Sequence, residues 1–213
     1  MSQAIPPLLQ VSDLSFSYPG RPIIEAWSQD FGPGISLLSA PDGAGSSTLL
    51  KLIGGALAPS AGRLIAAGLC AATDPRAYAR QVFAFDPELD AFQQQTAQDY
   101  FDHARNRHAQ REHGQWERHI AGFKLEPHLH KPMYMLSTGT RRKVGLTAAL
   151  SVQVAVCLLD EPLAALDLPS IRHLAAALAG YAAAGGTAWL IASHEPLPEQ
   201  LPVHATIEFT PIP

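Results

Sequence analysis

Three mostly apolar runs, each next to a helix-compatible segment, constrain the fold most strongly. They are ISLLS at 35–39, VAVCLL at 154–159 and TAWLIAS at 187–193. A strand that is apolar on both faces must be covered on both faces, and alternating strands and helices achieve this as a parallel sheet between helices. With 213 residues, of which 47% are hydrophobic, the chain can fill one core. We therefore expect one α/β domain over 1–213.

Two further regions differ from this core in composition. Short strands separated by turn signals predict a β-rich N-terminal part, in which the run at 8–18 is broken at Ser12-Asp13. A helix over 49–57 is expected to end at Ala58-Pro59. The segment at about 88–150 is polar and compatible with helices, and we expect it to form a small helical lobe inserted in the α/β core.

Positive charge is concentrated in part of that lobe. Between Asp102 and Lys143 the chain has nine basic and four acidic side chains, or +5, whereas the whole chain has 15 − 19 = −4. The same stretch contains six of the nine histidines. A solvated helical face explains this pattern, and the alternative is a docking surface for an acidic partner or a membrane surface.

The cysteines and the hydropathy indicate the cellular compartment in which the protein is expected. Cys70 and Cys157 lie far apart in sequence and predict neither a disulfide framework nor a metal-ligand cluster. No uncharged apolar run reaches about 18 residues, so no membrane span is expected. A cytoplasmic protein is the simplest interpretation.

The loop at 40–48 lies between the run ISLLS and a predicted helix. In that position glycines allow backbone N–H groups to wrap a phosphate at the N-terminus of the helix. The phosphate-loop pattern G-x-x-x-x-G-K-[ST] is only partly met, because Ala40 replaces its first glycine and Ser46 its lysine. Taken alone, the loop is equally compatible with an ordinary strand-to-helix connection.

Polar side chains follow two of the apolar runs. Asp160 and Glu161 come after VAVCLL, and Ser193-His194 ends TAWLIAS. Ligands bind at the carboxyl ends of strands in open α/β sheets, so the carboxylates could serve as a metal ligand and a general base. The alternatives are a polar helix start for the two acids and a structural role for the histidine.

Taken in order, these segments resemble the ATP-binding subunits of ABC transporters, from about Leu8 to Phe209. The resemblance rests on Tyr18 in SFSYPG, the phosphate-loop-like segment, the signature-like LSTGT at 136–140, the Walker B run VAVCLLDEP, LAALD and the Ser-His pair. LLDEPLAALD is the most specific part. The implied fold is of the P-loop NTPase type, with a parallel sheet core, an N-terminal antiparallel β-subdomain and a small helical lobe.

The resemblance also implies a role for each matching residue. Tyr18 would stack on adenine, although an ordinary strand-end tyrosine is the alternative. Glu161 would orient or deprotonate the attacking water, and His194 would contact the γ-phosphate. Mg²⁺ would be held by Ser47, Asp86 and Asp160. The loop that would cradle the phosphates consists of Pro41, Asp42, Gly43, Ala44, Gly45, Ser46, Ser47 and Thr48.

Proteins of this family hydrolyse ATP as head-to-tail dimers. Ser137 and Gly139, at the start of a helix, would therefore complete the site of the opposite protomer, and Asp167 would lie at the dimer seam. The implied partners are an integral membrane transporter subunit and a second ATP-binding subunit, identical or different. The chain would then lie at the inner face of the membrane. The transported substrate and the direction of transport stay open.

Two departures from the family pattern concern the phosphates. Ser46 removes a cation, which predicts ATP binding about 10- to 100-fold weaker than with lysine. Asp86 stands where the family has glutamine and adds negative charge, unless Gln93, Gln94 or Gln95 takes that role. Because Glu161 and His194 are retained, slow hydrolysis, or hydrolysis in a mixed dimer, is favoured over a non-hydrolysing regulatory subunit.

A third class, the soluble ABC ATPases of DNA repair and translation, fits less well. The chain shows neither a long coiled-coil insertion nor a second tandem domain, and its net charge is negative. We therefore expect no nucleic-acid partner.

Overall fold

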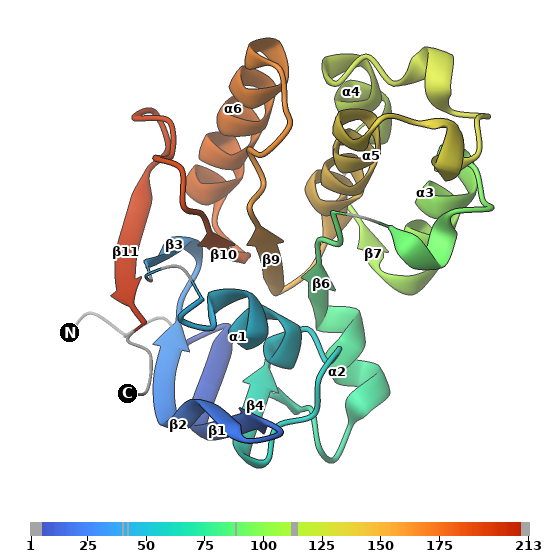
Figure 1. Cartoon of the computed structure of the whole chain (residues 1–213). Coiled ribbons are helices and arrows are strands. Elements are labelled where there is room, and N and C mark those ends of the chain that lie inside the picture. The colour runs from blue at the N-terminus through green and yellow to red at the C-terminus, as the bar shows by residue number, and fades with distance from the viewer. Residues whose placement is uncertain (1–5, 40, 42, 88, 112–114, 210–213) are drawn as a thin grey trace.

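The computed structural model describes residues 6–39, 41, 43–87, 89–111 and 115–209. Within these residues the strands form a four-stranded sheet of order β2-β1-β4-β5, a five-stranded sheet of order β11-β3-β10-β9-β6 and a β7-β8 pair. Figure 1 shows helices α3, α4 and α5 gathered away from the antiparallel sheet. This is the expected α/β architecture.

The four-stranded sheet is antiparallel and contains the first part of the chain. Its strands are β1 (Leu9–Tyr18), β2 (Arg21–Phe31), β4 (Ala61–Ala66) and β5 (Leu69–Cys70). The predicted break at Ser12-Asp13 is wrong, since β1 runs through it. The register instead shifts between Val11 and Leu14, and Asp13 has φ 50°. Its backbone N–H bonds Ser28 Oγ at 2.8 Å, so a local bulge absorbs the irregularity.

The five-stranded sheet is parallel, as the apolar runs predict. Its strands are β3 (Gly34–Ser39), β6 (Val82–Ala84), β9 (Val156–Asp160), β10 (Ala188–Ala192) and β11 (Val203–Glu208). Alternate residues of β9 enter different cores. Leu158 packs with α1 and the antiparallel sheet, whereas Cys157 and Leu159 pack with α5 and α6. Burial on both faces explains why the strand sequence lacks polar alternation.

Helices connect the strands. They are α1 (Ser46–Ile53), α2 (Pro75–Gln81), α3 (Ala97–Arg107), α4 (Gln115–Gly122), α5 (Thr138–Ser151) and α6 (Leu168–Ala184), and β7 (Ala109–Gln110) pairs with β8 (Val152–Gln153). Short 3-10 turns cover 90–92, 126–128 and 133–135. Helices α3 and α4 and most of α5 lie in the segment at 88–150, whose assignment as an inserted lobe stays a prediction.

The end of α1 differs from the sequence-based expectation. The helix stops at Ile53, with Gly54 as its C-cap and Gly55 at φ 76°, rather than at Ala58-Pro59. Two consecutive glycines end the helix because they lose more conformational freedom in it than other residues, and Gly55 tolerates the left-handed backbone. Among the described residues, none of the helices is both long enough and apolar enough to cross a bilayer.

Candidate functional site

The loop between β3 and α1 requires glycine at two positions. Gly43 has φ 72° and Gly45 has φ 109°, both in the left-handed region. A Cβ atom on Gly45 would lie 2.5 Å from Cγ2 of Ile23, so strand β2 leaves no room for a side chain there. The Ala44 N–H donates to the Pro41 carbonyl at 3.0 Å, which tightens the turn. The predicted residue Asp42 and the neighbouring position 40 lie outside the described residues.

Helix α1 begins directly after this loop. Ser46, Ser47 and Thr48 form its first turn, where the N–H groups have no acceptor inside the helix and the helix dipole favours an anion. Ser46 contributes a hydroxyl where a lysine would contribute a charge. The loop therefore retains backbone donors for a phosphate while it lacks the cation of the full pattern.

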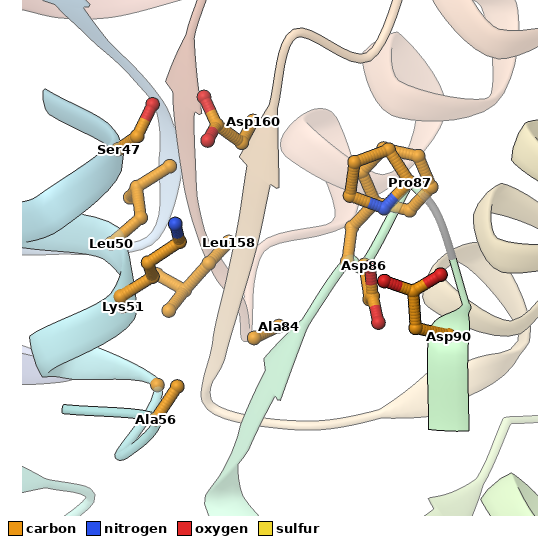
Figure 2. A pocket seen from close by; sticks show the side chains of 12 residues that line it. Ser47, Leu50, Lys51, Ala56, Ala84, Asp86, Pro87, Asp90, Leu158 and Asp160 are labelled. Carbon is orange, nitrogen blue, oxygen red and sulfur yellow. The ribbon is translucent and has the colours of Figure 1, made fainter.

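Ser47, Asp86 and Asp160 line one cavity of about 400 Å³. Ser47 comes from α1, Asp160 ends β9, and Asp86 follows β6. Figure 2 shows the Ser47 hydroxyl and the Asp160 carboxylate facing each other across the space between α1 and β9. The structure thus places all three residues on one cavity, with Asp86 beside Asp90 and away from Ser47 and Asp160 (Figure 2), and their binding of Mg²⁺ stays a prediction.

The donor set of this cavity fits Mg²⁺ bound together with a nucleotide. That ion takes one or two carboxylates in addition to phosphate oxygens and water, rather than a cage made only of protein ligands. Asp160 and Asp86 would supply the carboxylates, and Ser47 a hydroxyl.

Glu161 and His194 meet at the carboxyl ends of β9 and β10. Ala192 pairs with Asp160 in the sheet register, which places the residues after each strand side by side. Oε1 of Glu161 accepts a hydrogen bond from the backbone N–H of His194 at 2.9 Å and lies 3.5 Å from its Nε2. Both side chains are partly exposed, as residues that meet a ligand must be.

The backbone of Glu161 is held in a strained conformation. Its φ of 47° lies in the left-handed region, which costs a residue other than glycine about 1 kcal/mol or more. Its N–H donates to the Ala192 carbonyl at 2.8 Å, and its carbonyl accepts from the guanidinium of Arg142 on α5. Arg142 is buried and also lies over the ring of Phe85, 5.5 Å from its centroid. Helix α5 therefore helps to fix the carboxylate at the sheet edge.

Ser137 and Gly139 lie in the chain's own signature-like segment, outside the cavity that contains Ser47. Ser137 is the N-cap of α5 and accepts from the Thr140 N–H at 3.2 Å. A Cβ atom on Gly139 would lie 2.6 Å from the carbonyl oxygen of Ala165, so this segment packs against the LAALD loop. Neither residue is among the described residues that line the cavity. Their predicted role in an opposite protomer stays a prediction.

Asp167 joins α5 to α6. It is the N-cap of α6, accepts from the Ser170 N–H at 2.9 Å, and forms an ion pair with Lys143 at 2.5 Å. The Lys143 hydrogen bond, followed by those from Ser170, lowers the pKa of Asp167 well below its ordinary value. Within this chain Asp167 thus has a structural role, in addition to the place at a dimer seam predicted for it.

Tyr18 ends β1 and is 39% exposed. Its ring packs edge-on against Phe16, with 4.9 Å between the centroids. The side chain is thus partly open to solvent, and its proposed contact with adenine stays a prediction.

Sequence reasoning missed two residues of the site. Lys51 lines the same cavity as Ser47 and Asp160, and its position four residues after Ser47 on one helix could have indicated this. Arg142 belonged to a basic run that indicated only surface charge. Its contact with the Glu161 carbonyl depends on the packing of α5, for which the sequence gives no periodic signal.

Comparison with known proteins gives the context of this site. The family model described as "ABC transporter" matches residues 35–164, which include the glycine loop, the signature-like segment and the Asp160-Glu161 pair. The chain belongs to the ABC transporter family. It is an ATP-binding subunit of such a transporter, and the ATP-binding domains of this family are ATPases.

Relatives cover most of the chain. The cytochrome c biogenesis ATP-binding export protein CcmA of Cupriavidus pinatubonensis is 33% identical over 92% of this chain and 87% of its own length. The nickel import ATP-binding protein NikO of Rhodobacter capsulatus is 33% identical over 81% of this chain and 72% of its own. A solved ATP-binding subunit of an ABC transporter superposes with a TM-score of 0.78 at 25% identity, covering 88% of this chain and 80% of that one.

Proposed function

We propose that this ABC ATP-binding subunit binds ATP with Mg²⁺ weakly, hydrolyses it slowly, and works in a dimer on a separate membrane subunit. The observation that carries the proposal is the group of side chains that meet at the carboxyl ends of the parallel strands. Ser47 and Asp160 share one cavity, and the next residue, Glu161, is fixed by His194 and Arg142.

Each residue has a distinct task in this proposal. The loop at 43–48 and the first turn of α1 would bind the phosphates through backbone N–H groups. Ser47, Asp160 and Asp86 would hold Mg²⁺, which supplies charge neutralisation at the phosphates. Glu161 would accept a proton from, or orient, the attacking water, and His194 would donate a hydrogen bond to the terminal phosphate.

Weak binding and slow turnover follow from charge. With Ser46 in place of lysine, a charge-assisted hydrogen bond of about 1.5–3 kcal/mol is lost. Asp86 adds a carboxylate to the wall of the same cavity. The retention of Glu161 with its partners supports slow hydrolysis, and a non-hydrolysing regulatory subunit is the alternative that the experiment below distinguishes.

Partner and location belong to the same proposal. Relatives are named for cytochrome c biogenesis export and for nickel and cobalt import, so they share the ATP-binding task and differ in cargo. We therefore assign no cargo. The subunit would attach to the inner face of the membrane through a transporter subunit.

The test is ATP binding and Mg²⁺-dependent turnover of the purified chain, measured beside Ser46→Lys. We expect saturable binding of labelled ATP at millimolar or lower concentration, slow turnover, and a gain of about 10-fold or more in affinity with Ser46→Lys. Ser60→Lys, at an exposed position, is the matched control for added charge. ATP binding without any turnover, in Ser46→Lys as well, would favour the regulatory alternative. No saturable binding would refute the proposal.

A further inference from the structure

One cation outside the loop lies directly against it. Nη2 of Arg21, the first residue of β2, donates a hydrogen bond to the carbonyl oxygen of Gly43 at 3.3 Å. The contact spans 22 residues of sequence and joins the antiparallel sheet to the candidate phosphate loop.

The start of β2 supports the loop at a second point. Ile23, two residues after Arg21, is 7% exposed, and its Cγ2 is the atom that a Cβ on Gly45 would meet at 2.5 Å. Arg21 and Ile23 therefore lie beside the loop, Arg21 at Gly43 and Ile23 at Gly45. Ile23 thus places the backbone of β2 next to the loop, and the 3.3 Å hydrogen bond connects the Arg21 side chain to it.

The charge of Arg21 is available to a ligand. Its residue is exposed, and the bond to Gly43 uses one of the five N–H donors that a guanidinium carries. Across the β1–β2 hairpin its register partner is Tyr18, the residue proposed to stack on adenine. Arg21 is thus adjacent both to the proposed base contact and to the loop that would bind the phosphates.

Lys51, the cation of α1 near Ser47, faces a different environment. It shares its cavity with the carboxylates of Asp86, Asp90 and Asp160. The charge of Lys51 is therefore set against these carboxylates. Arg21 is not among the described residues that line this cavity, and its hydrogen-bond acceptor is a carbonyl of the loop itself.

We propose that Arg21 supplies the positive charge that Ser46 does not, and that its guanidinium binds the phosphates of the nucleotide. Guanidinium groups suit this task because they are always charged and can donate two parallel hydrogen bonds to a phosphate. This inference rests on the proposed function, since it requires that the loop bind a nucleoside triphosphate.

The experiment is a binding titration with labelled ATP in the presence of Mg²⁺, on five variants and the native chain. Arg21→Gln should weaken ATP binding about 10-fold, and Arg21→Lys should retain most of the affinity. Arg63→Gln, at an exposed position on β4 in the same sheet, is the control for loss of one positive charge and should change affinity less than about twofold.

The decisive comparison repeats Arg21→Gln in the Ser46→Lys background. If Arg21 replaces the loop lysine, the new lysine should compensate, and the loss caused by Arg21→Gln should shrink to about threefold or less. An equal loss in both backgrounds, or no loss in the native background, would overturn the inference while ATP binding itself upholds the proposed function. Absence of saturable ATP binding in the native chain would overturn both. Unchanged thermal unfolding of each variant without nucleotide would show that the fold is intact.

Discussion

Oε1 of Glu161 accepts the backbone N–H of His194 at 2.9 Å and lies 3.5 Å from the Nε2 atom of the same residue. The two residues are 33 positions apart and meet because β9 and β10 are neighbours in the parallel sheet. The backbone N–H of His194 therefore orients the carboxylate without any ligand. The imidazole of His194 lies close to the same oxygen, so substitutions at the two positions should not act independently.

Glu161→Gln should separate chemistry from binding. The amide keeps an oxygen that can accept the His194 N–H, whereas it cannot accept a proton from water, so turnover should fall at least about 100-fold. ATP affinity should change less than about threefold. Phosphate release and a labelled-ATP titration measure the two quantities. Glu199→Gln, at an exposed position, is the charge-matched control. A variant that hydrolyses ATP at the native rate would remove Glu161 from the mechanism.

Asp86→Gln should act jointly with Ser46→Lys. Asp86 lies on the cavity wall opposite Ser47, so its charge and the missing loop cation affect the same ligand. Removing the carboxylate should raise turnover about threefold to 30-fold, and the gain of the double variant should differ from the product of the single gains. Steady-state turnover of all four proteins provides the test. If the double variant is inert, the defect lies elsewhere in the site.

The sequence predicted the parts of the site that depend on position along a strand or a loop. Asp160, Glu161 and His194 follow apolar strands, and parallel strands bring their carboxyl ends to one edge, so adjacency in space followed from the pattern. The glycine loop could also be placed at this edge, because it follows the carboxyl end of another apolar strand, β3, and leads into α1.

Contacts that depend on packing between elements could not be predicted in this way. The bond from Arg142 to the Glu161 carbonyl requires the particular placement of α5 over the sheet. Asp13 suggested a break in β1 because its residue type favours turns, yet pairing with two neighbouring strands retains the strand and confines the irregularity to a bulge. Local preference was overridden there by the sheet.

The histidine-rich segment shows the same limit, because part of it is buried rather than solvated. His119 is 1% exposed, with its Nδ1 atom 3.1 Å from Nε2 of His173 and its Nε2 atom 2.8 Å from the Tyr181 hydroxyl. A Cβ on Gly122 would collide with His173, so glycine permits this contact. Burial lowers the pKa of His119 to about 3, and the other causes are His173, Arg118 and Arg111.

His119 should therefore make stability depend on pH. The folded state keeps the imidazole neutral, whereas the unfolded chain binds a proton near pH 6.5. The contribution of His119 to the free energy of unfolding should be constant above that value and fall as the pH decreases toward 3. At pH 5 the loss is about 2 kcal/mol.

Urea unfolding at pH 7.5 and pH 5 measures this loss. His119→Gln should be less stable at pH 7.5 and should lose much less on acidification, and His130→Gln, at an exposed position, should behave as the native chain does. The burial of His173 also lowers its pKa, so part of the decline should remain in His119→Gln. An undiminished decline in His119→Gln would contradict the assignment.

The last prediction concerns the partner. Ser137 caps α5 outside the cavity that contains Ser47, and the weak ATP binding that we propose would provide little free energy to close a dimer. The isolated chain should therefore stay largely monomeric in light scattering, with or without ATP and Mg²⁺. Glu161→Gln should be included in this measurement to prevent turnover.

In a mixed dimer with an intact ATP-binding subunit, the signature-like segment of this chain would contact the nucleotide bound by the partner. Ser137→Ala should then lower the partner's hydrolysis about 10-fold or more, because a hydrogen bond to the reacting phosphate is lost. Ser47→Ala should change that hydrolysis little, since Ser47 belongs to this chain's own site. A stable ATP-dependent homodimer at micromolar concentration would instead indicate a self-sufficient, slow ATPase.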